Sequence, residues 1–261
     1  MTYSPQKISL INAYRRKTKY ATKNFLDNYP SIYTKVYKKF SSNKGLFFNC
    51  DTDLVIDGFP SSGNTFLYRS FCKRVKNPLN ISHHMHSTSQ IRIATLGNVP
   101  VLLCFRDPID TAVSNSSRQQ LSYGRKIISE EKWLKYWYQY HLRLLDLIKC
   151  QNIYLCPFSK IINQTALIVN DTVATFFPSL DCIEGDFDSE IFSEISLHEQ
   201  QIKKGKFANA ALPSKEKTIM KKDIKESLTN KHPVLVEKAM KLYKLINKEY
   251  YENCSLFCRK G

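Results

Sequence analysis

The stretch DLVIDGFPSSGNTFL, residues Asp53–Leu67, contains the first of two strand-to-helix junctions that set the architecture. Its apolar run Leu54–Phe59 is typical of a short buried strand, and the residues from Thr65 to Val75 predict a helix. Glycine and proline at positions 58, 60 and 63 permit a tight turn between them. The first N–H groups of a helix lack acceptors within the helix and carry the positive end of its dipole. The junction therefore predicts an anion site.

A second junction, VPVLLCFRDPIDTAVS, follows at Val99–Ser114. The run Val99–Phe105 predicts another buried strand. Pro108 after Asp107 predicts a helix over Ile109–Gln120, with Pro108 in its first position and Asp107 as its N-cap. A second helix start then lies beside a strand end, so the two junctions together suggest a ligand with two separated phosphate groups.

The remaining periodic segments continue this alternation of strands and helices. We expect strands at Asn80–His86 and Ile153–Pro157, and helices at Ser89–Leu96, Glu130–Cys150, 160–176 and 233–251. Residues 181–218 lack clean periodicity and are predicted to be rich in loops. The pattern predicts an α/β fold with a central parallel sheet flanked by helices on both faces, a P-loop-like three-layer sandwich.

The chain is strongly basic, and its N-terminal segment is especially so. The 261 residues hold 39 Lys and Arg against 23 Asp and Glu, a formal net charge of +16, which favours acidic partners. Residues 1–50 contain a single acid, Asp27, and their apolar spacing predicts two short amphipathic helices broken near Pro30. We expect a basic helical arm packed on a domain at 51–261. Peripheral contact with a membrane surface or a polyanion is the alternative role of the arm.

The eight cysteines are scattered through the chain, mostly in apolar runs, and no two have CxxC spacing. This usage is typical of a reducing compartment and argues against a structural zinc site. No run of about 18 apolar residues predicts a membrane span, and no secretory signal is visible. We therefore expect a cytoplasmic protein.

Histidines cluster between the two junctions, in Ser82-His83-His84-Met85-His86. On a strand, His84 and His86 would share one face and His83 would point the other way. A histidine at the carboxyl end of a central strand is well placed to act as a general base. The alternatives are a structural or surface role, or a metal pair. No third ligand lies at a supporting spacing, so no metal is expected.

The loop and the second strand end carry complementary phosphate chemistry. No Lys follows Gly63, which argues against the nucleoside-triphosphate loop GxxxxGK-[ST]. Arg106 can hold a phosphate through two parallel hydrogen bonds, and a local salt bridge with Asp107 is its alternative role. Ser114 follows eight residues later, about two helical turns along the same side.

Together these pieces resemble the sulfotransferases that use 3′-phosphoadenosine 5′-phosphosulfate (PAPS), over about residues 53–250. PSSGNTF, from Pro60, is similar to the family's 5′-phosphosulfate loop. The spacing of Arg106 and Ser114 is similar to its 3′-phosphate element. The resemblance implies that the donor is bound by Ser61, Ser62, Gly63, Asn64, Thr65, Phe66, Arg106 and Ser114.

The resemblance also assigns the base and a C-terminal contact. A catalytic His precedes the family's Arg by about twenty residues, which His86 fits best, with His84 as the alternative. A basic motif near the C-terminus of the family closes over the 3′-phosphate. Lys203, Lys204, Gly205 and Lys206 are similar in place and type, and a solvated charge run is their alternative role.

One departure from the family concerns catalysis. The family loop usually has Lys or Arg immediately before Ser-Gly, and this chain has Ser61 there. Stabilising developing negative charge is often the largest catalytic contribution, so the loss matters. Arg69 or a Lys from 203–206 is a candidate substitute; otherwise the protein binds the nucleotide but turns over slowly. Asn64 replaces the family's first Thr and keeps its hydrogen-bonding capacity.

The resemblance implies transfer of a sulfuryl group from PAPS to a hydroxyl or amine, leaving adenosine 3′,5′-bisphosphate (PAP) and needing no metal. An acidic glycan or a small apolar alcohol is the expected acceptor. Two alternatives remain open: another P-loop-like nucleotide-binding phosphotransferase, and a non-catalytic polyanion- or RNA-binding protein. No RNA-binding motif is visible, so nucleic acid is not an expected partner.

Overall fold

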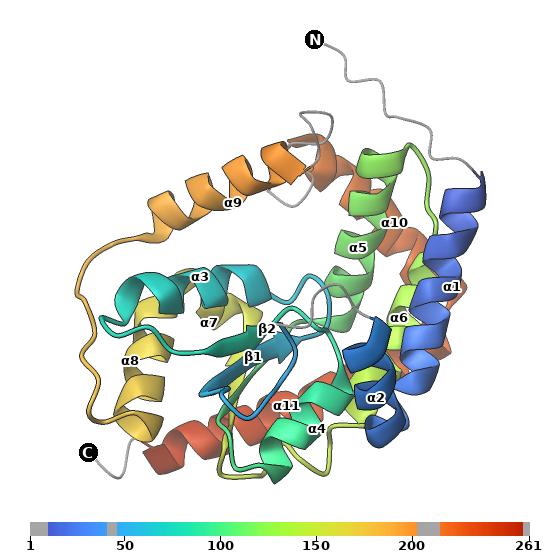
Figure 1. Cartoon of the computed structure of the whole chain (residues 1–261). Helices are drawn as coiled ribbons and strands as arrows, with labels where there is room; N and C mark the ends of the chain where they lie inside the picture. The colour runs from blue at the N-terminus through green and yellow to red at the C-terminus, as the bar shows by residue number, and fades with distance from the viewer. Residues whose placement is uncertain (1–9, 41–45, 203–214, 258–261) are drawn as a thin grey trace.

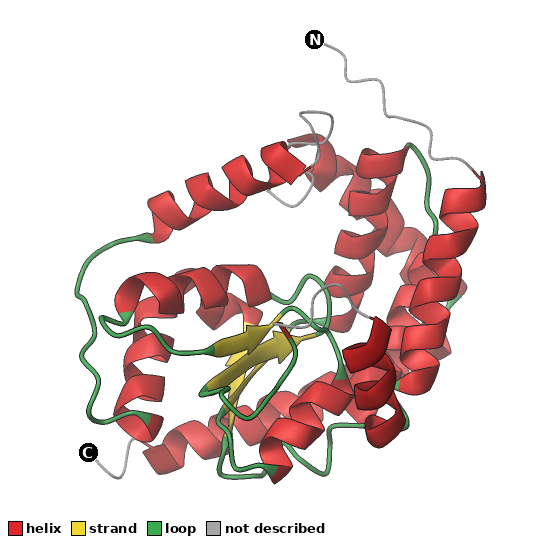
Figure 2. Ribbon diagram, in the orientation of Figure 1, coloured by secondary structure: helices red, strands yellow, loops and turns green. Residues whose placement is uncertain are grey.

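The computed structural model describes residues 10–40, 46–202 and 215–257, and its strands lie enclosed by helices (Figure 2). The described residues form strands β1 (Leu54–Gly58), β2 (Ile81–His83), β3 (Val101–Phe105) and β4 (Ile153–Pro157). The helices are α1 (Leu10–Leu26), α2 (Pro30–Phe40), α3 (Asn64–Arg74), α4 (Thr88–Leu96), α5 (Pro108–Tyr123), α6 (Glu130–Leu142), α7 (Phe158–Asn163), α8 (Thr165–Phe176), α9 (Asp188–Ile202), α10 (Lys215–Lys231) and α11 (Pro233–Phe257).

The four strands form one parallel sheet in the order β2-β1-β3-β4. Ile56 of β1 lies opposite His83 of β2 and Leu102 of β3. Because all strands run the same way, their carboxyl ends, including Gly58 and Phe105, meet at one edge of the sheet. The loops that follow these ends are therefore neighbours, as ligand sites in such folds require.

Helices cover both faces of the sheet and build two separate cores (Figure 1). Successive strand residues point to opposite faces, so Val55 belongs to one core while its neighbours Leu54 and Ile56 belong to the other. The first core packs the strands against α4, α5, α6, α10 and α11, and the second packs them against α3, α7, α8 and α9. The expected three-layer α/β fold with a helical N-terminal region is confirmed.

Several elements differ from their predicted extents. The second strand ends at His83, because His84 and His86 have φ angles of 60° and 49°, which no extended strand accommodates. The prediction that His84 and His86 share one strand face is therefore wrong. The helix expected at Glu130–Cys150 ends at Leu142, and the residues that follow it form turns.

Two further corrections concern the second half of the chain. The helix expected over 160–176 is interrupted at Gln164, whose φ of −143° separates α7 from α8. The expectation of loops over 181–218 is wrong for its central part, where α9 is a regular helix. This helix contacts α3 through ion pairs, such as Lys73–Glu190 at 2.7 Å, and through the ring of Phe192, whose centre lies 4.8 Å from that of Phe66. Ile191 is its fully buried apolar anchor.

The N-terminal helices α1 and α2 pack on the rest of the chain through a buried acid. Pro30 begins α2, which confirms the predicted break between the two helices. Asp27, 5% exposed, accepts hydrogen bonds from the backbone N–H groups of Thr88 at 2.8 Å and Ser89 at 3.0 Å. It therefore caps the N-terminus of α4 from outside that helix. None of the described helices is both long and apolar enough to cross a membrane.

Candidate functional site

The loop between β1 and α3 makes a tight turn that depends on Gly58 and on two residues with positive φ angles, Ser61 and Gly63. A Cβ at Gly58 would lie 2.1 Å from the carbonyl oxygen of Cys104 on β3, so only glycine fits there. Ser61 and Gly63 adopt positive φ angles of 70° and 95° and turn the chain into α3. Gly63 is the N-cap and supplies no side-chain acceptor, so the N–H groups of the first turn of α3 are not capped by its N-cap residue.

The side chains of this loop have different partners. Ser62 is fully buried, and its Oγ has no hydrogen-bond partner among the described residues. Asn64 is turned inward, with its Nδ2 donating to the carbonyl oxygens of Gly58 at 3.2 Å and Phe59 at 3.3 Å. Thr65 Oγ1 lies 2.6 Å from His84 Nε2. The Phe66 ring is buried beside Phe192, so Phe66 offers a ligand only its backbone N–H.

The second junction contacts the first directly. Arg106 Nη1 donates to the carbonyl oxygen of Ser61 at 3.2 Å, and its guanidinium lies 3.9 Å above the ring centre of Phe158. Asp107 caps α5 as predicted, with its Oδ1 accepting from the N–H of Asp110 at 2.9 Å. A carboxylate thus already occupies the start of α5. Of the two predicted anion sites, only the start of α3 lacks a side-chain cap, and anion binding there stays a prediction.

A lysine from α10 joins this region, which the sequence did not predict. Lys221 has a lowered pKa because it is partly buried and because the charge of Arg106 lies nearby. Lys225, one turn later, binds Asp110 at 3.0 Å and ties α10 to α5. The sequence around Lys221 shows only a lysine-rich helix, and such a helix usually has its lysines in solvent.

The predicted phosphate ligand Ser114 lies nearly buried on α5, at 7% exposure.

His86 lies at the carboxyl end of β1 with one ring nitrogen engaged. Its Nδ1 is 2.8 Å from the carbonyl oxygen of Gly58. A carbonyl can only accept, so Nδ1 carries the hydrogen and Nε2 keeps its lone pair. Nε2 has no hydrogen-bond partner among the described residues, and the side chain is 25% exposed. Burial, followed by the charge of Lys23, lowers the pKa of His86 well below its ordinary value and keeps it neutral.

His84 is placed differently from His86. Its Nε2 lies against Thr65 Oγ1, and its Nδ1 is 2.5 Å from His83 Nδ1. Burial, followed by the charge of Arg69, lowers the pKa of His84 to about 4. Both nitrogens of His84 are therefore engaged, whereas Nε2 of His86 is available. The geometry favours His86 over His84 as a base.

Asp57 lies beneath His86 and holds its backbone. It is fully buried and accepts hydrogen bonds from the N–H groups of Gly58 at 2.9 Å and His86 at 2.8 Å. Burial raises the pKa of Asp57 to about 7. Lys23 of α1 donates to the carbonyl oxygen of Met85 on the same loop. Sequence reasoning missed this acid, although a lone Asp within an apolar strand was an available signal.

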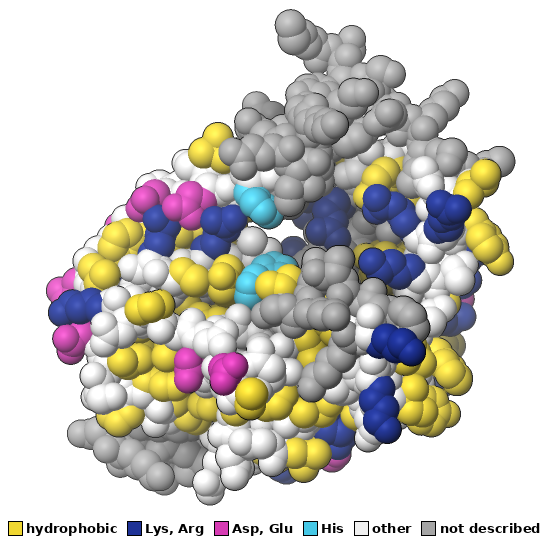
Figure 3. Space-filling view, viewed as in Figure 1, with side chains coloured by type: hydrophobic (Ala, Val, Ile, Leu, Met, Phe, Trp, Pro, Cys, Tyr) yellow, Lys and Arg dark blue, Asp and Glu magenta, His cyan; other side chains and the backbone are white. Residues whose placement is uncertain are grey.

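The remaining predictions concern basic residues and metal binding. Lys203, Lys204, Gly205 and Lys206 lie outside the described residues, so their contact with the 3′-phosphate stays a prediction. Arg69 forms an ion pair with Glu194 at 2.9 Å, an acid that also pairs with Lys73 at 2.8 Å. Within the described ranges, no group of three or more His, Cys, Asp or Glu side chains is placed to hold a metal. Figure 3 shows histidine side chains beside a hollow that Lys and Arg side chains also border.

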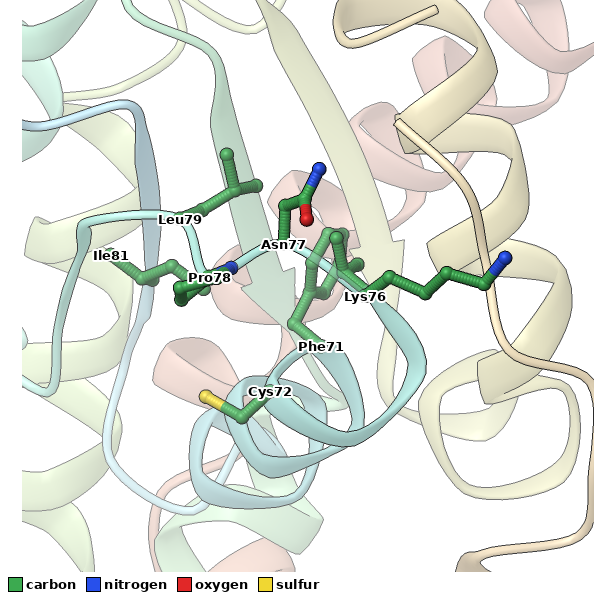
Figure 4. A pocket seen from close by; sticks show the side chains of 8 residues that line it. Phe71, Cys72, Lys76, Asn77, Pro78, Leu79 and Ile81 are labelled. Carbon is green, nitrogen blue, oxygen red and sulfur yellow. The ribbon is translucent and has the colours of Figure 1, made fainter. Parts of the chain in front are cut away.

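A separate cavity of about 150 Å³ lies at the opposite end of α3 (Figure 4). It is lined by side chains between α3 and the start of β2, among them Phe71, Cys72, Pro78 and Ile81. Since β2 begins at Ile81, this cavity is remote from the carboxyl edge of the sheet and from the histidines. It is mostly apolar and offers no arrangement for phosphate chemistry.

Comparison with known proteins found no match to the chain among family models, curated proteins or solved structures. Function is therefore inferred from the residues of the chain and their geometry.

Proposed function

We propose that the chain is a PAPS-dependent sulfotransferase that transfers a sulfuryl group to a hydroxyl or amine acceptor. The observation that carries the proposal is the 3.2 Å hydrogen bond from Arg106 to the carbonyl oxygen of Ser61. It brings a phosphate-binding arginine against a loop that opens into a helix without a side-chain cap. His86 lies at the same edge of the sheet, with its Nε2 available.

The donor would be held at its two ends. The N–H groups that begin α3, together with the unpartnered Ser62 hydroxyl, suit the 5′-phosphosulfate. Arg106, Ser114 and Lys221 suit the 3′-phosphate, with Lys203, Lys204 and Gly205 expected to close over it. A buried hydroxyl without a partner beside an open helix start is the feature that best fits an anionic ligand.

The reaction would be an in-line displacement at sulfur. The acceptor oxygen or nitrogen forms a bond to sulfur as the bond from sulfur to the bridging oxygen of the 5′-phosphate breaks. His86 Nε2 takes the acceptor proton, and the leaving group departs as PAP. The hydrogen bond from His86 Nδ1 to Gly58 fixes the ring so that Nε2 is the nitrogen presented to the acceptor.

The acceptor class and the cellular setting are further proposals. The net charge of +16 favours an acidic glycan, and an apolar alcohol is the other candidate. Cys50, Cys72, Cys104, Cys150, Cys156 and Cys182 are free thiols, which supports a cytoplasmic location. Peripheral contact of α1 and α2 with an anionic membrane stays a proposal for the basic arm.

Ligand binding tests the proposal before any acceptor is known. We expect PAP to raise the melting temperature in a thermal-shift assay, and ATP at equal concentration to raise it less. A larger shift with ATP would instead support a phosphotransferase. Steeply salt-dependent binding to RNA, with no shift from either nucleotide, would support a polyanion-binding protein.

Transfer tests the base. His86→Gln should lose sulfuryl transfer from PAPS while keeping the PAP-induced shift. His232→Gln, at a half-buried position between α10 and α11, is the matched control. Removing a general base typically costs about 10²–10⁴-fold in rate. A His86→Gln enzyme with the wild-type rate would refute the role of His86.

A further inference from the structure

Asn115 connects the phosphate loop to a second arginine on α5. Asn115 is fully buried, and its Nδ2 donates to the carbonyl oxygens of Pro60 and Thr111, each at 3.0 Å. Its Oδ1 accepts from Ser61 Oγ at 3.1 Å and from Arg118 Nη2 at 3.3 Å. The amide is thus fixed by four hydrogen bonds, and it holds the Arg118 guanidinium one side chain away from Ser61.

The charge of Arg118 is available for a ligand. Arg118 is half-buried and forms no ion pair with any acid in the described part of the chain, whereas Arg69 is paired with Glu194 at 2.9 Å. Its positive charge also contributes to lowering the pKa of His86, which supports its placement near that ring. On α5, Arg118 lies one turn after Ser114, so both residues project from the same side of the helix.

We propose that Arg118 supplies the cation that the loop lacks at Ser61, binding the bridging oxygen and the 5′-phosphate as negative charge develops there. This inference rests on the proposed function. Asn115 is the positioning residue: it holds the guanidinium against the loop and leaves the remaining N–H groups of Arg118 for the ligand. An arginine from α5 would thereby take the place of a basic residue in the loop itself.

Paired variants test the inference. Arg118→Gln should lower kcat for transfer from PAPS to 2-naphthol, or to desulfated heparin, by about 10²–10³-fold, the usual cost of losing one charge-stabilising donor. Arg92→Gln is the matched control and should stay within about threefold of wild type, because Arg92 lies outside the site and both of its Nη atoms bind Asp146, at 2.7 and 2.9 Å. Arg118→Lys should recover part of the lost rate.

Two readouts separate a direct role from a structural one. Arg118→Gln should weaken binding of 5′-AMP but not of 3′-AMP, and Arg106→Gln should do the reverse. Removing the positive charge should also move the acid limb of the kcat/KM profile to higher pH. The inference is wrong if wild type transfers sulfuryl and Arg118→Gln behaves like Arg92→Gln. If wild type neither binds PAP nor transfers, the proposed function and the inference fail together.

Discussion

Removing the Asp27 carboxylate should detach the N-terminal helices from the start of α4. The side chain accepts four hydrogen bonds there, two to each oxygen. Oδ1 accepts from Ser87 Oγ at 2.5 Å and the Ser89 N–H at 3.0 Å, and Oδ2 accepts from the Thr88 N–H at 2.8 Å and its Oγ1 at 2.9 Å. All four residues are buried, so water cannot easily replace the carboxylate.

The expected cost of Asp27→Ala is about 3–5 kcal/mol of unfolding free energy. Each buried donor left without an acceptor costs about 1–3 kcal/mol, and the two backbone N–H groups contribute most because hydroxyls can rotate toward other acceptors. The substitution also removes the negative charge of Asp27, which favours the charged form of the half-buried Lys23, and this adds to the loss. Asp27→Asn should cost less, since one oxygen remains to accept two of the four bonds.

Urea unfolding at pH 7, followed by tryptophan fluorescence, measures this cost. Trp133 is a suitable probe because it is buried and its ring centre lies 5.2 Å from that of Tyr20 on α1. Asp223→Ala, an exposed acid on α10, is the control and should change the unfolding free energy by less than about 0.5 kcal/mol. An Asp27→Ala protein as stable as this control would refute the reasoning.

Three further predictions concern stability. Gly58→Ala should cost on the order of 4 kcal/mol or prevent folding, because the new Cβ meets the carbonyl of Cys104; the yield and melting temperature of the soluble protein check this. Trp137→Ala should cost about 3–5 kcal/mol in urea unfolding, because it empties a fully buried core position. Burial lowers the pKa of His141 to about 4 from an unfolded value of about 6.5, so the folded state binds fewer protons between these values and stability falls as pH falls. His141 should thus contribute a loss of about 2 kcal/mol at pH 5, which His141→Leu should abolish. Asp57, whose pKa is raised to about 7, acts in the opposite direction in both proteins and cancels in that comparison.

Local sequence was enough to identify the elements that depend on near neighbours. The run Leu54–Phe59 and the identical predicted and observed bounds of Ile153–Pro157 follow from short apolar stretches bounded by turn residues. The Asp107 cap and the Pro108 helix start also follow from residues within one turn. The order of strands and helices then predicted the parallel α/β sheet and its loop-bearing edge, because few topologies satisfy that alternation.

Only the tertiary structure decided which side chains meet at that edge. Two of these contacts, Asp27 with Thr88 and Arg106 with Ser61, join residues far apart in sequence. Asn115 and Arg118 are close in sequence, but only the structure shows that Asn115 also bonds Ser61 of the phosphate loop. Such contacts leave no periodic signal, since they depend on how elements dock. The loop that carries His84 and His86 at positive φ angles is likewise held by distant residues, since Asp57 accepts from the His86 N–H and Lys23 donates to the carbonyl oxygen of Met85. The residue types at the site and the uncapped start of α3 at Gly63 were thus readable locally, whereas the free nitrogen of His86 depends on long-range packing.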